Sequence, residues 1–377
     1  MIEIAQKEQC CGCSACVSVC PKHSISFLED KEGFLYPKVD LETCIDCGLC
    51  EKVCPVINQE SEREPLAVYA AKNDDESIRV KSSSGGIFTL LAEKVIDEGG
   101  VVFGARFNEK WEVIHDYTET KDGLEPFRGS KYVQSNIGES YQQTETFLKA
   151  GRKVMFTGTP CQIAGLKKFL RKDYENLFTV DFVCHGVPSP LVWRMYLEEE
   201  SIRFGKDINA VEEINFRDKS TGWKTYSISI KLSKNIVSSA VFTDNNYMGA
   251  FLSNLSLRPC CYQCPAKAGK SGANITIGDF WGIENVMPEL DDDRGISVLV
   301  NYNEGNSLFK ALQTVSYGEI LVANPCLVKS VIKPTKREIF FSRLTRKGFN
   351  YAVKKTFMSK FINRMIKYIY RIKVWFI

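Results

Sequence analysis

The chain has 377 residues, 44% of them hydrophobic, and its 49 Lys and Arg against 46 Asp and Glu give a formal charge of +3. This composition excludes a peptide, a coiled coil and a disordered tail, and the small net charge argues against nucleic-acid binding. The fifteen cysteines accompany neither a signal peptide nor an apolar run of eighteen residues, so we expect a cytoplasmic protein rather than a secreted disulfide scaffold or a membrane span.

Eight cysteines within the first 54 residues form a duplicated motif. In each copy, three cysteines separated by two residues are followed, after three more residues, by Cys-Pro. This is the spacing of two-cluster bacterial ferredoxins, in which the fourth cysteine of each motif ligates the other cluster. The predicted ligand sets are Cys10, Cys13, Cys16 and Cys54 for one 4Fe-4S cluster, and Cys44, Cys47, Cys50 and Cys20 for the other. Zinc is the alternative for soft thiolates, but two complete motifs favour iron-sulfur clusters.

Residues 1–58 are predicted to form an α+β ferredoxin-like domain with a hairpin of strands over 24–29 and 34–39. Cys11 lies between motif positions and is interpreted as a small buried residue. Residues 1–60 carry ten Asp and Glu against five Lys and Arg, which would attract a soluble electron donor or acceptor protein with a basic surface. Residues 59–66, which contain three glutamates, are predicted to be a linker.

Residues 67–335 are predicted to form an α/β domain with a mixed, largely parallel sheet, because apolar strands alternate with amphipathic helices. The expected strands are 68–72, 101–107, 153–157, 177–183, 275–278 and 296–301, and the expected helices are 86–97, 138–149, 162–170, 191–204 and 305–315. Strands over 214–216, 226–232 and 237–242 follow one another without helices, which predicts an antiparallel insertion.

A run of three serines and two glycines, residues 82–86, precedes the first of these helices. Hydroxyl groups and glycines at a helix N-terminus offer backbone N–H groups and the positive end of the helix dipole, which suits a phosphate group. An ordinary helix cap explains the pattern equally well, and the G-x-G-x-x-G dinucleotide motif is absent.

Two cysteines follow the ends of successive predicted strands, Cys161 after 153–157 and Cys184 after 177–183. Because the carboxyl ends of parallel strands meet at one edge of a sheet, both are expected at the ligand-binding edge. Cys261 and Cys264 form a CxxC half-site, and together the four thiolates could hold a third 4Fe-4S cluster. A zinc ion, or a buried CxxC without metal, remains the alternative.

These motifs, in this order, resemble the family of coenzyme F420 hydrogenase/dehydrogenase beta subunits, here with a fused ferredoxin. The motifs that carry the resemblance are 82–86, 129–133, 158–162, 184–186, Cys261-x2-Cys264 and 277–282. The resemblance implies an α/β domain that binds FAD and has its own 4Fe-4S cluster near the flavin. By position, it places the flavin near Ser83, Ser84, Gly85, Gly86 and Lys131, and the third cluster at Cys161, Cys184, Cys261 and Cys264.

The resemblance implies an iron-sulfur flavoprotein oxidoreductase that passes electrons between ferredoxin-type clusters and, through FAD, a reducible small molecule such as coenzyme F420. A reductase of a sugar or polysaccharide precursor and a non-catalytic relay subunit of a larger complex are the alternatives. His185, next to Cys184, is the histidine best placed to transfer a proton, although a lone histidine is more often structural.

Residues 336–377 are predicted to be a basic amphipathic tail. From 333 onward there are 13 Lys and Arg and one acid, and apolar residues recur at helical spacing at Val353, Phe357, Phe361, Met365 and Ile369. Such a helix suits an anionic membrane surface, which would place the protein peripherally at the inner face of the membrane. Packing of the apolar face on the α/β domain or on a partner is the alternative.

Overall fold

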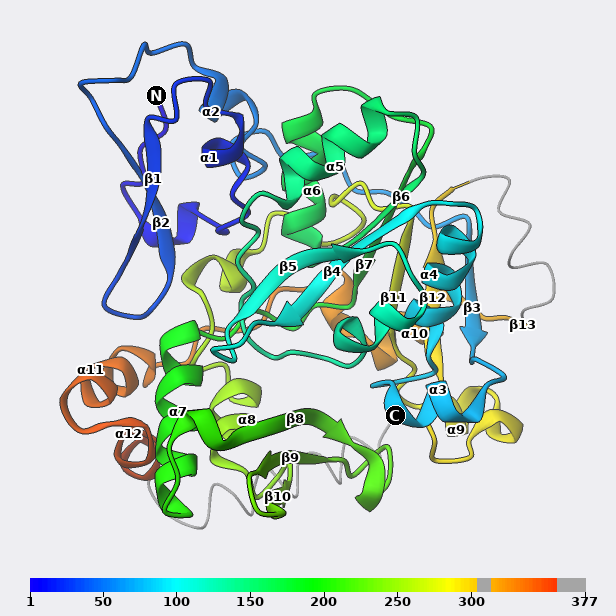
Figure 1. Cartoon of the computed structure of the whole chain (residues 1–377). Coiled ribbons are helices and arrows are strands. Elements are labelled where there is room, and N and C mark those ends of the chain that lie inside the picture. The colour runs from blue at the N-terminus through cyan, green and yellow to red at the C-terminus, as the bar shows by residue number, and fades with distance from the viewer. Residues whose placement is uncertain (304–312, 358–377) are drawn as a thin grey trace.

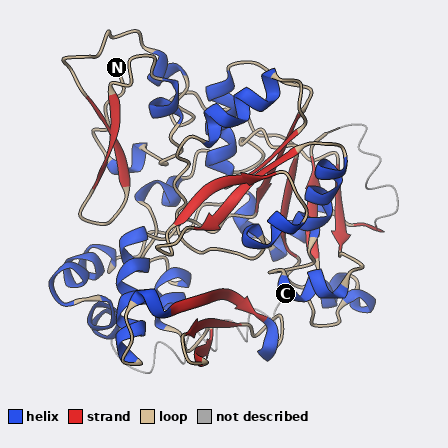
Figure 2. Cartoon of the chain, viewed as in Figure 1, coloured by secondary structure: helices blue, strands red, loops and turns tan. Residues whose placement is uncertain are grey.

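The computed structural model describes residues 1–303 and 313–357 (Figure 1). Three helices pack on the main sheet: α4 (Ile87–Asp97), α5 (Ser140–Lys149) and α6 (Pro160–Leu170). The longest described helix, α7 (Pro190–Arg203), lies beside the antiparallel insertion. The shorter helices are α3 (Glu76–Lys81), α8 (Asn246–Leu252), α9 (Ile283–Val286) and α10 (Tyr317–Ala323). Figure 2 shows strands at the centre with helices around them, as expected for an α/β protein.

The N-terminal segment contains the predicted hairpin. Strands β1 (Ile25–Glu29) and β2 (Leu35–Val39) pair antiparallel, which confirms the hairpin expected over 24–39. Two short helices, α1 (Ala15–Val19) and α2 (Leu49–Lys52), carry the middle of the two cysteine motifs. Each helix begins after a residue in the left-handed region, Ser14 at φ 69° and Gly48 at φ 70°, so both motifs turn in the same way.

The main sheet has eight strands in the order β13-β3-β12-β11-β7-β6-β4-β5. Their bounds are β3 (Ala67–Ala71), β4 (Val101–Phe107), β5 (Val113–Thr118), β6 (Val154–Thr157), β7 (Leu177–Phe182), β11 (Ile275–Asp279), β12 (Ser297–Asn301) and β13 (Gln313–Thr314). The six expected strands are present and the sheet is mixed, as predicted. The expectation of a largely parallel sheet is wrong, because only β4, β6, β7 and β11 pair parallel.

The antiparallel pairs lie at both edges of this sheet. Strand β5 pairs with β4 across a turn of five residues, and a connection this short permits only antiparallel pairing. Strand β12 pairs antiparallel with both β11 and β3. Strand β13 lies where the end of the helix 305–315 was expected, so that part of the prediction is wrong, since pairing with β3 overrides the helical pattern. Residues 304–312 lie outside the described residues.

Alternate residues of the central strands pack on opposite faces of the sheet. Phe103 and Phe156 join the core under α5 and α6, whereas Val102 and Met155 join the core under α4. This period of two is the reason that buried parallel strands read as continuous apolar runs. The central strands are therefore covered by helices on both faces, and their ends remain available to form a site.

The antiparallel insertion is present as predicted. It consists of β8 (Val211–Asp218), β9 (Ser227–Leu232) and β10 (Ile236–Val241), in the order β10-β9-β8. Figure 1 shows it below the main sheet, facing the strand ends.

The described part of the C-terminal tail packs on the protein. It forms α11 (Arg337–Lys347) and α12 (Phe349–Thr356), and Val353 is 3% exposed in the main core. The Glu199 side chain on α7 accepts hydrogen bonds from the first backbone N–H groups of α12. Phe361, Met365 and Ile369 lie outside the described residues. Within the described ranges, no helix is long and apolar enough to cross a membrane.

Candidate functional site

A cavity of about 1440 Å³ lies between the strand ends of the main sheet and the insertion. The segments that line it include 82–84, 128–133, 157–159, 181–188 and 277–279. Strands β6, β7 and β11 end at this cavity, so their carboxyl ends form its wall, which is where α/β proteins bind ligands. Pockets that bind drug-sized ligands measure about 300–1,000 Å³, so this cavity has room for a larger molecule or for two.

The glycine and serine turn forms one rim of the cavity. Gly86 is the N-cap of α4 with φ 81°, and no side chain caps the first turn of that helix. A Cβ at Gly85 would stand 2.5 Å from the Ala71 carbonyl oxygen, so only glycine fits there. The N-cap residue therefore supplies no side-chain cap, and the first residues of α4, Ile87 and Phe88, line the cavity, which suits an anion cradle.

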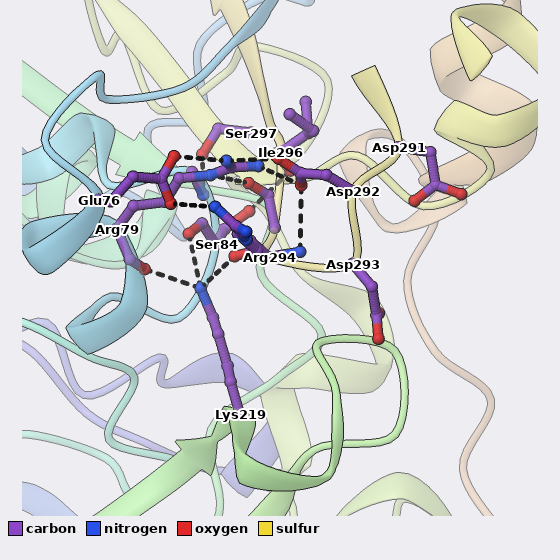
Figure 3. Close-up of polar contacts among 12 residues, drawn as sticks. Glu76, Arg79, Ser84, Lys219, Asp291, Asp292, Asp293, Arg294, Ile296 and Ser297 are labelled. Atoms are coloured by element: carbon purple, nitrogen blue, oxygen red, sulfur yellow. Dashed lines mark hydrogen bonds and ion pairs between the residues drawn. The ribbon is translucent and has the colours of Figure 1, made fainter. Parts of the chain in front are cut away.

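The turn is held from two sides (Figure 3). The Nζ atom of Lys219, the residue after the insertion strand β8, donates to the carbonyl oxygens of Arg79, Ser84 and Arg294 at 2.6–3.0 Å. The Arg79 guanidinium is fully buried and forms a bidentate pair with Asp292, at 2.6 and 2.7 Å. These contacts hold the cradle in a fixed position.

Lys131 lines the cavity close to the turn. Its Nζ atom donates to the carbonyl oxygens of Pro126 and Arg128 at 2.7 and 2.9 Å, so two of the three donors of the ammonium are used. Burial lowers the pKa of Lys131 to about 7, which makes its charge sensitive to pH in the physiological range.

Sequence reasoning missed two ionisable residues in this cavity. Arg217 on β8 pairs with Asp279 at 3.1 Å and lies 3.9 Å from the centre of the Tyr226 ring, and its buried Nε atom has no hydrogen-bond partner in the described part of the chain. Asp181 is buried at the end of β7, and burial raises its pKa to about 6. Neither has a local sequence signal, because each acquires its role from contacts with distant segments.

The cysteines of the first predicted ligand set lie together. Cys54, from the second motif, lies near enough to Cys10, Cys13 and Cys16 for their charges to interact. Burial and the charge of Cys10 raise the pKa of Cys16 to about 12 in the metal-free chain. The structure therefore brings the fourth cysteine of the second motif to the first, as the ferredoxin rule requires.

The second set is also brought together. One small hollow is lined by Cys20, Cys44, Cys47 and Cys50. The backbone N–H of Ile2 donates to the sulfur of Cys50 at 3.2 Å, and that of Ser24 donates to the sulfur of Cys20 at 3.3 Å. Such N–H donors to sulfur stabilise thiolate charge and tune iron-sulfur centres.

The third set of thiols lies beside the cavity. Thr159 is the N-cap of α6, and its side chain accepts a hydrogen bond from the backbone N–H of Gln162. Cys161 therefore lies in the first turn of the helix, as the strand-turn-helix pattern predicted. Burial and the charges of Cys261, Cys161 and Cys264 raise the pKa of Cys184, so the four thiols are near one another.

Cys260 and Cys261 differ although they are neighbours. The Cys260 thiol donates to the sulfur of Cys261, and this bond lowers the pKa of Cys261. The backbone N–H of Val187 also donates to the sulfur of Cys261, at 3.4 Å. Cys261 is thus the thiol prepared as a thiolate, and Cys260 supports it.

All three sets consist of thiols, which fits iron-sulfur ligation. Among residues 1–303 and 313–357, no three His, Cys, Asp or Glu side chains surround the position of a single metal ion.

His185 is on the cavity wall. Its Nε2 atom lies 2.7 Å from Asn254 Oδ1, and its Nδ1 atom lies 3.8 Å from the sulfur of Cys326, a cysteine that had no predicted role. Burial lowers the pKa of His185, which favours the neutral imidazole.

Comparison with known protein families gives three matches. Residues 68–140 match the N-terminal part, and residues 151–336 the C-terminal part, of the coenzyme F420 hydrogenase/dehydrogenase beta subunit. Residues 9–58 match a 4Fe-4S dicluster domain.

Individual relatives agree with these matches. The chain is 28% identical over 230 residues to a subunit of the F(420)H(2) dehydrogenase of Methanosarcina mazei, covering 57% of this chain and 62% of the relative. It is 26% identical over 241 residues to the coenzyme F420-dependent sulfite reductase of Methanocaldococcus jannaschii, covering 57% of this chain and 36% of the relative. The chain thus spans less than two thirds of these relatives.

A chain from the F420-reducing [NiFe] hydrogenase complex of Methanosarcina barkeri aligns in structure with a TM-score of 0.47 and 17% identity, over 78% of this chain and 94% of that one. The order of the motifs and the family matches lead to one conclusion. The chain belongs to the family of coenzyme F420 hydrogenase/dehydrogenase beta subunits and carries a 4Fe-4S dicluster domain at its N-terminal end.

Proposed function

We propose that the protein is an iron-sulfur flavoprotein oxidoreductase that exchanges electrons between its N-terminal dicluster domain and a reducible small molecule in the cavity. Three 4Fe-4S clusters would be held by Cys10, Cys13, Cys16 and Cys54, by Cys20, Cys44, Cys47 and Cys50, and by Cys161, Cys184, Cys261 and Cys264. FAD would lie against Ser83, Ser84, Gly85, Gly86 and Lys131. Bound flavin supplies the step between two-electron and one-electron chemistry, and clusters carry single electrons.

One observation carries this proposal: a single cavity has an uncapped helix N-terminus on one rim and Cys184 on its wall. The helix end and Lys131 favour an anionic group such as a pyrophosphate. Cys184 belongs to the third thiol set, so a cofactor bound at the cradle would lie in the same cavity as one ligand of that set. Arg217 lines the opposite, insertion side of the cavity, where its guanidinium pairs with Asp279.

The volume of the cavity supports a second molecule beside the flavin. The relatives are named for coenzyme F420, so we propose F420 or a related reducible molecule as that substrate. Arg217 and Lys224 lie on the cavity wall, where Arg217 pairs with Asp279 and Lys224 pairs with Glu284 and Asp291.

The test is anaerobic mixing of the flavin-loaded protein with reduced F420, followed by the flavin absorbance. Bleaching of the flavin supports the proposal. A flavin that stays oxidised with reduced F420, yet is reduced by an electron-donor protein, would contradict F420 as the substrate. A protein that binds no flavin would instead be a relay.

His185 is proposed to hold or transfer a proton at Nδ1, since Asn254 occupies Nε2.

We also propose a cytoplasmic electron-carrier protein as the partner of the acidic dicluster domain, because one of the relatives is named as a subunit of a dehydrogenase. Binding of the basic tail to an anionic membrane remains a proposal, and equal flotation of full-length and tail-deleted protein with anionic liposomes would contradict it.

Lys131 should make flavin binding depend on pH. Below pH 7 the ammonium is charged and attracts the pyrophosphate, whereas above pH 7 it must first gain a proton, so FAD affinity should fall as pH rises through 7. In Lys131→Gln this dependence should disappear, and affinity at pH 6 should fall about tenfold or more, as expected for a charge-assisted hydrogen bond. Fluorescence quenching of FAD from pH 6 to 8.5 measures both effects.

The exposed Lys110→Gln variant is the control and should behave like the unmodified chain. An affinity that is independent of pH in the unmodified chain, or equal pH profiles in that chain and Lys131→Gln, would remove Lys131 from the flavin site.

A further inference from the structure

Arg258 lies at the junction between the dicluster domain and the α/β domain, and it is 0% exposed. Its Nε atom donates to the Cys10 carbonyl oxygen at 2.7 Å, and its Nη2 atom lies 2.9 Å from the Leu35 carbonyl oxygen and 3.4 Å from the Cys10 sulfur. Its Nη1 atom donates to the Gln134 side chain at 3.0 Å. The guanidinium also stacks 4.4 Å from the centre of the Tyr36 ring. The guanidinium thus contacts the first cysteine motif through Cys10, strand β2 through Leu35 and Tyr36, and the α/β domain through Gln134.

This buried cation has no carboxylate partner. Arg79, Arg217 and Arg337 are similarly buried and pair with Asp292, Asp279 and Glu32, respectively. For Arg258, in contrast, no Asp or Glu lies within 4.0 Å among the residues that the structure describes, and its nearest ionisable neighbours are Cys10, Cys260 and Tyr36. A buried charge without a counter-ion is strongly unfavourable, so the site requires negative charge from elsewhere.

Thiolates bound to a cluster would supply that charge. We propose that Arg258 is the built-in counter-charge of the cluster held by Cys10, Cys13, Cys16 and Cys54, and that it raises the reduction potential of this cluster above that of the cluster held by Cys20, Cys44, Cys47 and Cys50. Net charge and hydrogen bonds to sulfur are recognised determinants of cluster potential. The inference rests on the proposed function, because it requires the clusters to be bound.

The second thiol set has the opposite environment. Cys47 is exposed, and the neighbouring carboxylates of Asp46 and Glu51 lie 3.0 and 3.5 Å from the N-terminal ammonium, which they neutralise. Lys22, which also borders this set, is exposed to water, where its charge is screened. The one buried cation that contacts a motif sulfur is therefore at the first set, within the described residues.

The first set is also the one next to the α/β domain. A Cβ at Gly165 on α6 would stand 2.8 Å from the Cβ of Cys13, and Cys11 is hydrogen-bonded to the thiols of both Cys13 and Cys161. With both clusters bound, Arg258 would favour one electron on the first cluster over the second, with no bond or proton changed. Arg258 thus holds the electron beside the third thiol set, as a positioning residue for transfer into the cavity.

The test is EPR-monitored redox potentiometry of the full chain, purified without oxygen. In Arg258→Gln, the reduction potential of one cluster should fall by at least about 59 mV. At a given applied potential, its ratio of reduced to oxidised cluster should therefore fall at least about tenfold, since one electron is transferred. Arg258→Lys keeps the charge and should retain most of the potential. The reduction step that disappears from the titration of Cys47→Ser identifies the second cluster. The potential of that step should not change in Arg258→Gln.

The control is the double variant Glu32→Gln/Arg337→Gln. It removes both charges of a buried pair at the same junction, so it loosens the junction without leaving an unpaired charge. At a given applied potential, the ratio of reduced to oxidised cluster should stay within about threefold of that in the unmodified chain. Equal shifts in this control and Arg258→Gln, or no shift in Arg258→Gln at unchanged iron content, would overturn the role of Arg258 and leave the proposed function standing.

The unmodified chain gives a second measurement should Arg258→Gln fail to fold. The reduction potential of its second cluster must lie below that of the first by at least the shift that changes the ratio of reduced to oxidised cluster about tenfold. Equal potentials would overturn the inference. Absence of iron-sulfur signals from the unmodified chain would instead overturn the proposed function itself.

Discussion

Replacing Cys261 by serine should remove about four of twelve iron atoms and leave the other two clusters intact, since a hydroxyl is a poor ligand for a 4Fe-4S cluster. The hydrogen bonds from Cys260 and from the Val187 N–H prepare the Cys261 sulfur as a thiolate. Iron and acid-labile sulfide analysis of anaerobically purified protein measures the effect. The loss should be accompanied by the disappearance of one EPR signal, whereas the two dicluster signals remain.

The adjacent residue provides the matched control. Cys260 is buried and donates to the sulfur of Cys261, so Cys260→Ser should keep all the iron, because a serine hydroxyl can still donate that bond. Loss of iron in Cys260→Ser but not in Cys261→Ser would mean that the ligand has been assigned to the wrong one of the two neighbours.

The second large effect should come from Gly165→Val. A Cβ at this position of α6 would meet Cys13 at 2.8 Å and the Tyr141 hydroxyl at 2.9 Å, so the branched side chain would push the first cysteine motif away from the α/β domain. Overpacking of this kind costs about 1–3 kcal/mol of folding free energy. Displacing Cys13 should also lose about four iron atoms. Denaturant unfolding and iron analysis report the two effects separately.

Gly249→Ala is the control for that variant. Gly249 lies in the short helix α8, and among the residues that the structure describes an added Cβ would meet the Phe357 ring at 3.8 Å, an ordinary contact. Because alanine is the better helix former, this variant should be as stable as the unmodified chain or more so, with full iron content. A Gly165→Val protein with normal stability and iron content would show that the motif does not depend on its contact with α6.

The local parts of this molecule were predictable from sequence. The two cysteine motifs depend on spacing along the chain, and the crossed pairing of Cys20 and Cys54 follows from a general rule for such motifs. The hairpin β1–β2, the central strands and the capped turn before Cys161 likewise carry local signals. Each of these features has a signal that can be read from a short stretch of sequence, and the crossed pairing follows from joining two such stretches by the rule.

The features that sequence did not predict depend on distant segments. Strand β5 reads as a mixture of apolar and charged residues, and its pairing with β4 identifies it. Arg217 reaches the cavity from the insertion, and Arg258 contacts Cys10 across 248 residues of chain. No pattern near either arginine indicates its partners. Tertiary contacts also decided the described part of the tail, whose Val353 is buried against the protein core rather than left for a membrane.

The central claim is that one chain holds three 4Fe-4S clusters and a flavin. It is tested most directly by purifying the full chain without oxygen and measuring iron, sulfide, zinc and flavin in the same sample. The account predicts about twelve iron atoms, about twelve sulfides and one FAD per chain, without zinc. About eight iron atoms with one zinc ion, or no flavin at all, would contradict it.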